Sequence, residues 1–306
     1  MRSTGCSASR SPTRAATGTS PKARDGVTRR LRLDAELVRR GLARSREHAG
    51  TLIEEGQVKV AGSVATKAAT GVTTDQAIVV RASNEPTYAS RGAHKLLGAL
   101  AVFEPMGLTV AGKRCLDAGA STGGFTDILL RKGARQVCAV DVGYGQLVWA
   151  LQSDDRVVVF DRTNVRRLEA DDIGGPVELI VSDLSFISLT VVMPALTRVC
   201  EPSSPEGGGD IVLMIKPQFE VGKSNLGKNG VVRDPALHAD AVHRVCLSAY
   251  EQGWGTKALA PSPLPGPAGN VEYFCWLRSD AEAPSEEAAH AVVAAGPLDA
   301  TSGEGA

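Results

Sequence analysis

The chain has 306 residues and no net formal charge, and 43% of its residues are hydrophobic, which suffices for the packed cores of one or two domains. No apolar run approaches the roughly 18 residues of a membrane span, so the sequence predicts no membrane association. The six cysteines form no C-x-x-C pair, and Cys115, Cys138 and Cys275 lie in apolar runs. This indicates reduced core residues of a cytoplasmic protein and no metal site.

Charge is distributed unevenly along the chain. Residues 1–95 hold 17 Lys and Arg against 8 Asp and Glu, so we expect a basic module that binds a polyanion at the front. Residues 1–28 are rich in Ser, Arg and Gly without an apolar period, and residues 279–306 carry six acids and no Lys or Arg. We expect both ends to be disordered tails, with a transit peptide as the alternative for the first.

Residues 29–82 are expected to form a small α+β module of two helices and a hairpin. Leu33 and Leu37 have helical spacing, Ser45 is suited to cap a second helix that stops at Gly56, and the run from Val58 alternates like a short strand. The basic residues of the module are Arg32, Arg39, Arg40, Arg44, Arg46, Lys59 and Lys67.

This module resembles the alpha-L RNA-binding domain named after ribosomal small-subunit protein four. The matching positions are Arg32-Leu-Asp34, Arg39-Arg-Gly41-Leu, Ser45-Arg46, Leu52-Ile53, Gly56, Val58 and Val60-x-Gly62. The resemblance implies that the basic residues bind RNA, mainly through phosphates, which position the RNA without reading its sequence. Without the resemblance, charged helix faces of this kind are usually only solvated.

After a linker at residues 83–89, residues 90–278 are expected to form an α/β, Rossmann-like domain. An apolar strand ends at Asp117 and breaks into a glycine-rich turn, which leads into a helix over residues 125–132 and a strand over residues 136–141. Strand, turn, helix and strand in this order open a doubly wound nucleotide-binding sheet. Acids stand at three successive strand ends, at Asp117, Asp141 and Asp161, which favours a ligand site over an ordinary turn.

The turn has the spacing D-x-G-x-x-x-G-G and not the G-x-G-x-x-G of a dinucleotide site. An acid before the first glycine would repel a pyrophosphate but suits the ammonium group of S-adenosylmethionine, so we expect that cofactor and not NAD or FAD. Asp141 suits the ribose hydroxyls, and Asp161 with Asn164 the adenine edge. The other expected cofactor contacts are Asp117, Gly119, Ser121, Thr122, Gly123, Gly124, Phe125 and Asp183.

Two further apolar strands end in charged residues, at Asp183 and at Lys216, and Glu272 opens a late strand. Ligands of such sheets bind at the carboxyl ends of the strands. A lysine after five apolar residues is costly unless it has a partner or a function. Together with Lys95, which lies beside the apolar stripe of an earlier helix, these residues are the candidate catalytic groups.

At these four positions the chain resembles the Lys-Asp-Lys-Glu tetrad of FtsJ-like RNA 2′-O-methyltransferases, and residues 31–278 look like the TlyA family of rRNA cytidine 2′-O-methyltransferases, also called haemolysins. The motifs are Ser90-Arg-Gly-x-His-Lys95-Leu, Asp117-x-Gly-Ala-Ser-Thr-Gly-Gly-Phe-Thr126, Asp141-Val-Gly-Tyr-Gly-Gln146-Leu, Arg162-Thr-Asn-Val-Arg166, Asp183-x-Ser-Phe-Ile-Ser188-Leu and Ile215-Lys-Pro-Gln-Phe-Glu220. Ala93 stands where the family usually has Gly, and Asp161 where it usually has Glu. The resemblance implies methylation of cytidine in 16S or 23S rRNA, within ribosomal subunits.

The chemistry needs a base, because a ribose 2′-hydroxyl is a poor nucleophile until its proton is removed or shared. We expect Lys216 to be that base, with Lys95 lowering its pKa and steering the hydroxyl or a phosphate, and with Asp183 and Glu272 holding both lysines in line. Which lysine takes which role stays open. The alternative for all four residues is ordinary ion pairing at strand ends.

Other functions lack their motifs. A base N-methyltransferase would show Pro-Pro-aromatic where Asp183 is followed by Leu-Ser-Phe, and a cytosine-C5 enzyme would show Pro-Cys. Two alternatives remain: an RNA-binding protein without activity, and a membrane-active haemolysin, which no long apolar or amphipathic segment favours. Nothing in the sequence marks a dimer interface, so we expect a monomer.

Overall fold

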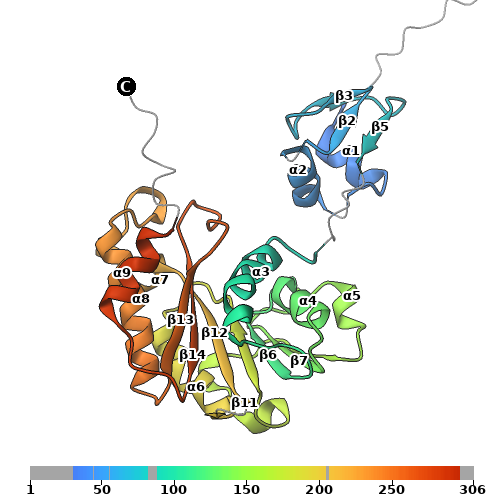
Figure 1. Ribbon diagram of the computed structural model, residues 1–306. Coiled ribbons are helices and arrows are strands. Elements are labelled where there is room, and N and C mark those ends of the chain that lie inside the picture. The colour runs from blue at the N-terminus through green and yellow to red at the C-terminus, as the bar shows by residue number, and fades with distance from the viewer. Residues whose placement is uncertain (1–29, 44, 55, 82–87, 205–206, 297–306) are drawn as a thin grey trace, which may run out of the picture. The chain divides into compact units, whose positions relative to one another are not determined.

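The structure, a computed structural model, describes residues 30–43, 45–54, 56–81, 88–204 and 207–296. The chain divides into two compact units, Met1–Pro86 and Thr87–Ala306 (Figure 1). The tail expected at residues 1–28 and most of the expected linker lie outside the described residues. In the described part of the chain, no helix combines the length and the apolar character needed to cross a membrane.

The first unit packs two helices against short strands. The antiparallel sheet has the order β3-β2-β5, and β1 pairs with β4. Ser45 caps the second helix as predicted, since its hydroxyl accepts the N–H of His48 at 3.1 Å. Leu33, Leu37 and Ile53 belong to the core of this unit. The elements are β1 (Leu31–Arg32), α1 (Leu33–Arg39), α2 (Arg46–Glu54), β2 (Val58–Val60), β3 (Ser63–Val64), β4 (Gly71–Val72) and β5 (Ile78–Val80).

The second unit is built on a seven-stranded sheet with the order β13-β14-β12-β9-β6-β7-β8. The five strands from β12 to β8 are parallel, whereas β14 pairs antiparallel with β12, and β13 pairs antiparallel with β14. This confirms the predicted Rossmann-like fold. The strands are β6 (Arg114–Ala118), β7 (Gln136–Val140), β8 (Val157–Phe160), β9 (Leu179–Ser182), β12 (Asp210–Ile215), β13 (Gly255–Pro261) and β14 (Tyr273–Arg278); β10 (Ser203–Ser204) and β11 (Gly207–Gly208) form a separate hairpin.

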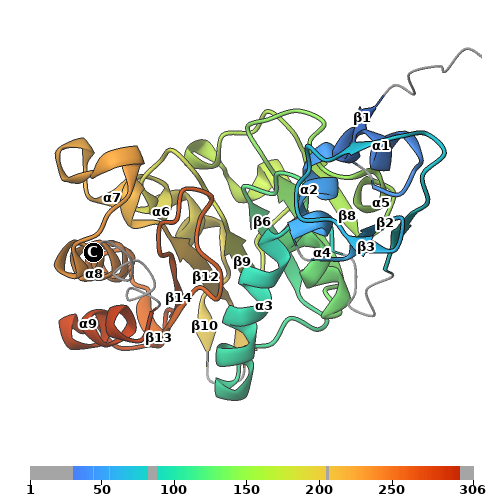
Figure 2. The same cartoon turned by 90° about the horizontal axis from the view of Figure 1, so that it is seen from above.

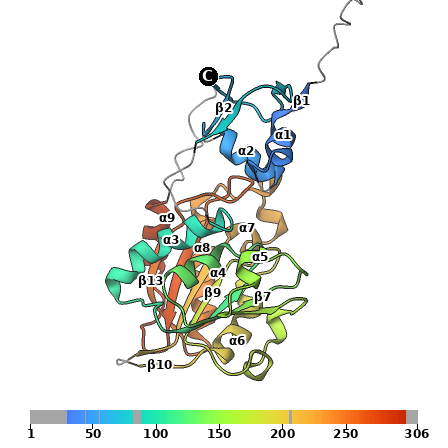
Figure 3. The same cartoon turned by 90° about the vertical axis from the view of Figure 1, so that its right-hand side faces the viewer.

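Helices cover both faces of this sheet. Figures 1 and 2 show α6, α8 and α9 on one side and α3, α4 and α5 on the other, and Figure 3 shows α3 and α4 in front of the strands. Strand side chains alternate between the two cores, as Cys115 and Leu116 do. The helices are α3 (Gly92–Phe103), α4 (Gly124–Arg131), α5 (Trp149–Gln152), α6 (Leu189–Val199), α7 (Pro217–Glu220), α8 (Pro235–Tyr250) and α9 (Glu286–Ala294).

The prediction of a disordered acidic tail from residue 279 is wrong for residues 279–296. Ser285 caps α9, and Ala289, Val292 and Val293 of that helix are buried in the core that α8 and the sheet share. These three positions have helical spacing, but the apolar stripe is short and partly alanine. The acids on the exposed face therefore dominate the local composition, which is why the sequence pattern predicts a solvated tail.

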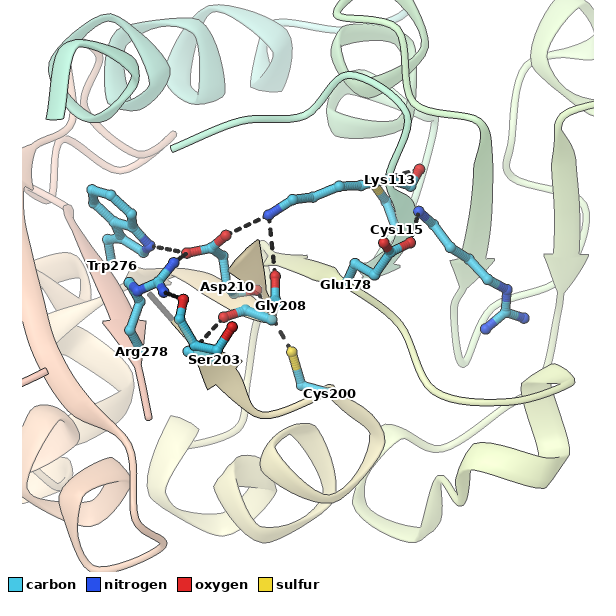
Figure 4. A network of polar contacts seen from close by, with 12 residues as sticks. Lys113, Cys115, Glu178, Cys200, Ser203, Gly208, Asp210, Trp276 and Arg278 are labelled. Carbon is cyan, nitrogen blue, oxygen red and sulfur yellow. Dashed lines mark hydrogen bonds and ion pairs between the residues drawn. The ribbon is translucent and has the colours of Figure 1, made fainter. Parts of the chain in front are cut away.

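A buried polar network lies at the amino end of β12 (Figure 4). The carboxylate of Asp210 is 2.5 Å from the Lys113 ammonium and 3.1 Å from the Arg278 guanidinium, and it accepts the indole N–H of Trp276 at 2.7 Å. Asp210 is only 2% exposed, so its charge depends on these partners. The network joins β12 and β14 to Lys113, the residue before β6. It lies at the amino end of β12, whereas Lys216 follows the carboxyl end of that strand.

Candidate functional site

Strand register brings the four candidate catalytic residues to one edge of the sheet. The parallel neighbours β9 and β12 end just before Asp183 and Lys216. Strand β14 runs antiparallel to β12 with Tyr273 opposite Ile215, so Glu272, which precedes β14, lies beside Lys216. Lys95 arrives from the first turns of α3.

The four side chains form two lysine–carboxylate pairs. Lys95 Nζ lies 2.5 Å from Glu272 Oε2, and Lys216 Nζ lies 2.6 Å from Asp183 Oδ1. Both lysines and Glu272 are buried. Each lysine is therefore paired with a carboxylate, and the expected influence of Lys95 on Lys216 stays a prediction.

Two glycines lie beside these pairs, and at Gly266 a side chain would collide with Glu272. A Cβ at Gly92, the first residue of α3, would lie 3.9 Å from Asp183 Oδ2, so the helix that carries Lys95 begins against the other ion pair. A Cβ at Gly266 would lie 2.7 Å from Glu272 Oε1. The segment around Gly266 therefore covers the carboxylate of Glu272 and keeps it at 1% exposure.

The 183–188 loop contributes two residues that belong to a quoted motif but are not among the predicted site residues. Ser185 Oγ accepts a hydrogen bond of 2.8 Å from Lys216 Nζ. Phe186 is 91% exposed, has a φ of 64°, which is a strained value for a bulky residue, and lies 5.3 Å from the ring of Phe219. Both residues follow an acid at the end of a strand. This position could have marked them as site residues in the sequence, because loops after strands carry ligand contacts in α/β sheets.

Asp117 lies beneath the glycine-rich loop and not at its surface. It is fully buried in β6 and accepts the hydroxyl of Thr126 at 2.7 Å, while its Oδ1 atom has no partner among the described residues. Burial raises the pKa of this carboxyl to about 7. Phe125 is likewise 3% exposed and packs on Phe274, so these two predicted contacts could act on a cofactor only from below the loop.

The remaining loop residues are shaped for close approach. Gly119 and Gly123 have φ values of 91° and 100°, and Ser121 has the strained value of 47°. A Cβ at Gly119 would lie 3.0 Å from the Asp183 carbonyl oxygen, so the loop sits directly beside the catalytic edge. A Cβ at Gly124 would lie 2.9 Å from the backbone nitrogen of Ala93, so this glycine is required by the packing of α4 against α3.

The acids after β7 and β8 hold the neighbouring loop. Asp141 accepts the N–H groups of Ser121 at 2.8 Å and Gly143 at 2.7 Å, and Asp161 accepts that of Gly145 at 2.9 Å. Asn164 accepts the N–H of Arg166 and caps a short 3-10 helix, Val165–Arg167. Such a set of carboxylates, with the buried acid of Asp117 beneath the loop, fits a ligand that carries an ammonium group and hydroxyls.

Replacing Asp117 by Asn should stabilise the ligand-free protein at neutral and higher pH and weaken cofactor binding. The folded protein binds the Asp117 proton more tightly than the unfolded chain does, so wild-type stability should fall as pH rises from about 4 to about 7. An asparagine side chain cannot ionise, so we expect the Asp117→Asn variant to gain about 1–3 kcal/mol at pH 8 over the wild type. Denaturant unfolding at pH 5 and pH 8 measures this, with the exposed Asp171→Asn as control.

If the stability of the Asp117→Asn variant follows the wild-type pH dependence, Asp117 is not the titrating group. Cofactor affinity, measured by calorimetry on the same samples, should fall at least about 10-fold if the Asp117 charge favours the ammonium group.

In the first unit, buried carboxylates orient the predicted RNA-binding arginines. Asp34 pairs with Arg32 at 3.0 Å and with Arg46 at 2.8 Å, and these hydrogen-bonded arginines hold the pKa of Asp34 well below its usual range. The exposed fractions of the two arginine side chains are 52% and 61%. Both guanidinium groups therefore keep surface that a phosphate could reach.

Glu36 orients Arg39 and Arg40 in the same way, and their hydrogen bonds lower its pKa to about 2. Arg40 differs from the others because it also donates to the carbonyl oxygens of Thr73, Thr74 and Gln76. Arg40 thus anchors the turn before β5, and the structure does not favour its predicted role in RNA binding. Lys67 is exposed and Lys59 partly buried, while Arg44 lies outside the described residues.

Among the residues that the structure describes, no group of three or more His, Cys, Asp or Glu is placed to hold a metal ion. The cysteines in the described ranges are buried and free.

Comparison with known proteins places each unit in a family. Residues 88–279 match the FtsJ-like methyltransferase model, and residues 31–78 match the S4 domain model. The chain is 52% identical to the Mycobacterium tuberculosis protein named 16S/23S rRNA (cytidine-2′-O)-methyltransferase TlyA, over 89% of this chain and 100% of that protein.

Relatives with haemolysin names are also similar. Hemolysin A of Brachyspira hyodysenteriae is 37% identical over 80% of this chain and 98% of its own length. A solved hemolysin-type structure from Streptococcus thermophilus superposes with a TM-score of 0.68 at 35% identity, covering 88% of this chain and 96% of that one.

Proposed function

This chain belongs to the TlyA family of FtsJ-like methyltransferases, and we propose from that membership that it methylates the ribose 2′-oxygen of cytidine in 16S or 23S rRNA, with S-adenosylmethionine as methyl donor. The observation that carries the proposal is the pair Lys216–Asp183, set beside the pair Lys95–Glu272 and next to the glycine-rich loop. These groups supply a candidate base, fixed charges and a cofactor cradle within one sheet edge.

The bound cofactor would supply a methyl group that is already electrophilic. The protein therefore has to activate and position the 2′-hydroxyl. Lys216 would take the 2′-hydroxyl proton at Nζ, the atom that contacts Asp183 and Ser185 in the ligand-free protein. Lys216 must be neutral to accept this proton, and its free lone pair must face the hydroxyl in place of one of these two contacts. Lys95, fixed by Glu272, would hold the hydroxyl or an adjacent phosphate in line with the methyl group.

The cofactor would lie against the loop that contains Gly119, Ser121, Thr122, Gly123 and Gly124. Asp141 would exchange its backbone donors for the ribose hydroxyls, and Asp161 would act similarly toward the adenine end. Asp117 would act from below through its charge. Asn164 already serves as a helix cap, which weakens the case for a direct contact.

The S4 domain would bind rRNA phosphates with Arg32, Arg39, Arg46, Lys59 and Lys67, within a ribosomal subunit. Buried Asp34 and Glu36 support this role because they fix the arginines before RNA arrives, which lowers the entropy cost of binding. A monomeric state and a cytoplasmic location stay predictions.

The direct test is transfer of labelled methyl from S-adenosylmethionine to ribosomal subunits that lack the modification. We expect label on the ribose of cytidine, identified as 2′-O-methylcytidine after complete nuclease digestion. Label on a base would contradict the proposed chemistry. Cofactor binding without any transfer to either subunit would favour the binding-only alternative.

A further inference from the structure

Glu220 is a buried carboxylate at the catalytic edge that the proposed chemistry does not use. It is 8% exposed, and burial raises the pKa of its carboxyl. Oε1 accepts the backbone N–H of Leu189 at 2.8 Å, and Oε2 accepts the hydroxyl of Ser188 at 2.5 Å. Arg244 contacts the residue too, but through the Glu220 carbonyl oxygen at 2.8 Å. Both carboxylate oxygens of Glu220 therefore accept hydrogen bonds from the residues at the start of α6.

Those contacts close a second link between the two segments that carry the catalytic pair. The 183–188 loop begins at Asp183 and ends at Ser188, and the 216–220 turn consists of Lys216 and the single helical turn α7. At the first end, Lys216 Nζ contacts Asp183 and Ser185. At the far end, Glu220 holds Ser188. The loop and the turn are thus fixed to each other at both ends.

The loop between these links is strained. Phe186 has a φ of 64°, and such a conformation in a bulky residue persists only where the surroundings enforce it. The contact between the rings of Phe186 and Phe219 lies on the exposed side and leaves Phe186 91% exposed, so it enforces little. The bonds from Ser188 and Leu189 to Glu220 are the buried polar restraint at the end of this loop.

Helix capping alone does not account for Glu220. Ser188 already caps α6, since its hydroxyl accepts the N–H of Thr190 at 3.2 Å. A second, charged cap that must be buried costs desolvation, which an ordinary surface cap avoids. Glu220 lies four residues after Lys216, at the end of the same turn. A buried acid there can fix the start of α6 relative to Lys216, which capping by Ser188 alone does not do.

We propose that Glu220 is a positioning residue, which holds the 183–188 loop against the 216–220 turn so that Ser185 and Asp183 stay in place around Lys216 Nζ. The proposal rests on the proposed 2′-O-methyl transfer. Glu220 does not touch substrate, because its carboxylate is buried behind the loop. Its loss should therefore lower the rate of the chemical step without changing cofactor affinity.

The test compares Glu220→Ala, Glu220→Gln and the wild type in methyl transfer to ribosomal subunits. We expect Glu220→Ala to lower kcat by about 10- to 100-fold with KM and the Kd of S-adenosylmethionine within about 3-fold of wild type, because small misplacements of reacting groups have effects of that size. Glu220→Gln should keep kcat within about 3-fold, since the amide oxygen can accept from Leu189 and the amide nitrogen can donate to Ser188.

The matched control is Ser285→Ala, which removes the cap of α9 away from the catalytic edge. It should lower Tm and leave kcat unchanged. If Glu220→Ala lowers Tm as Ser285→Ala does and keeps wild-type kcat, Glu220 is only a cap and the proposal is overturned. If Glu220→Ala does not fold, Glu220→Asp shortens the reach by one methylene, and wild-type kcat in that variant overturns the proposal equally.

Failure of the proposed function is separable from failure of this inference. Wild-type protein that binds S-adenosylmethionine but transfers no methyl contradicts the proposed function. In that case hydrogen exchange decides the inference: exchange of the 183–189 amides should rise in Glu220→Ala and not in Glu220→Gln. Unchanged exchange at Leu189 in both variants would contradict the positioning role.

Discussion

Substituting Lys216 by Met should lower kcat for methyl transfer by about 10³-fold or more, with cofactor affinity within a few-fold of wild type. General-base catalysis is typically worth about 10²–10⁴-fold, and the substitution also leaves Asp183 without its partner. Methionine keeps the apolar stem, so packing around the 8% exposed side chain should change little. Single-turnover transfer to ribosomal subunits, together with cofactor titration, measures both quantities.

Lys216→Arg separates a base from a fixed charge. Arginine keeps the positive charge beside Asp183 but does not give up its proton at ordinary pH, so it should be nearly as inactive as Lys216→Met. Substantial activity in Lys216→Arg would mean that Lys216 acts electrostatically and that the proton leaves by another route. Lys257→Ala, which replaces an exposed lysine on β13, is the matched control and should retain wild-type kcat.

The largest effect on stability is expected from Asp210. Asp210→Ala leaves the Lys113 ammonium and the Arg278 guanidinium without their buried partner and the Trp276 indole N–H without its acceptor. Breaking a buried ion pair from one side typically costs about 3–5 kcal/mol, so the free energy of unfolding should fall by that amount. Chemical denaturation monitored by the fluorescence of Trp276 and the other tryptophans measures it.

Asp280→Ala serves as the control for this prediction. Asp280 also pairs with Arg278, at 2.7 Å, but it is exposed, so its removal should cost no more than about 1 kcal/mol. Adding Lys113→Met to Asp210→Ala should recover part of the loss by removing one of the orphaned charges. Equal effects of Asp210→Ala and Asp280→Ala would show that the network is solvated and contributes little. Cofactor affinity should not change, because the network lies at the opposite end of β12 from Lys216.

Local pattern was sufficient for much of this protein. The glycine-rich turn after β6, the acids at strand ends and the cap at Ser45 were predicted from short stretches, because each is fixed by backbone geometry or hydrogen bonding within a few residues. Lys216 is a candidate by similar local reasoning, since a lysine after an apolar strand is costly without a purpose. The resemblance to the FtsJ-like tetrad joins it to Lys95, Asp183 and Glu272. The sequence thus determined the fold class, the family and which charged residues gather at the carboxyl edge.

How those residues pair, and which of them reach the surface, depends on contacts between segments that are distant along the chain. Lys95 pairs with Glu272, which is 177 residues away. The antiparallel register of β14 brings Glu272 to the edge of the sheet where Lys216 lies, and α3 brings Lys95 to the same edge. Segments distant in sequence also bury Asp117 and supply the carbonyl groups that Arg40 contacts. The hydrogen bonds of Glu220 to the start of α6 depend on distant segments in the same way. Hydrogen bonding and desolvation act through space, so a residue's neighbours across strands and helices, and not its neighbours along the chain, set its charge state and its role.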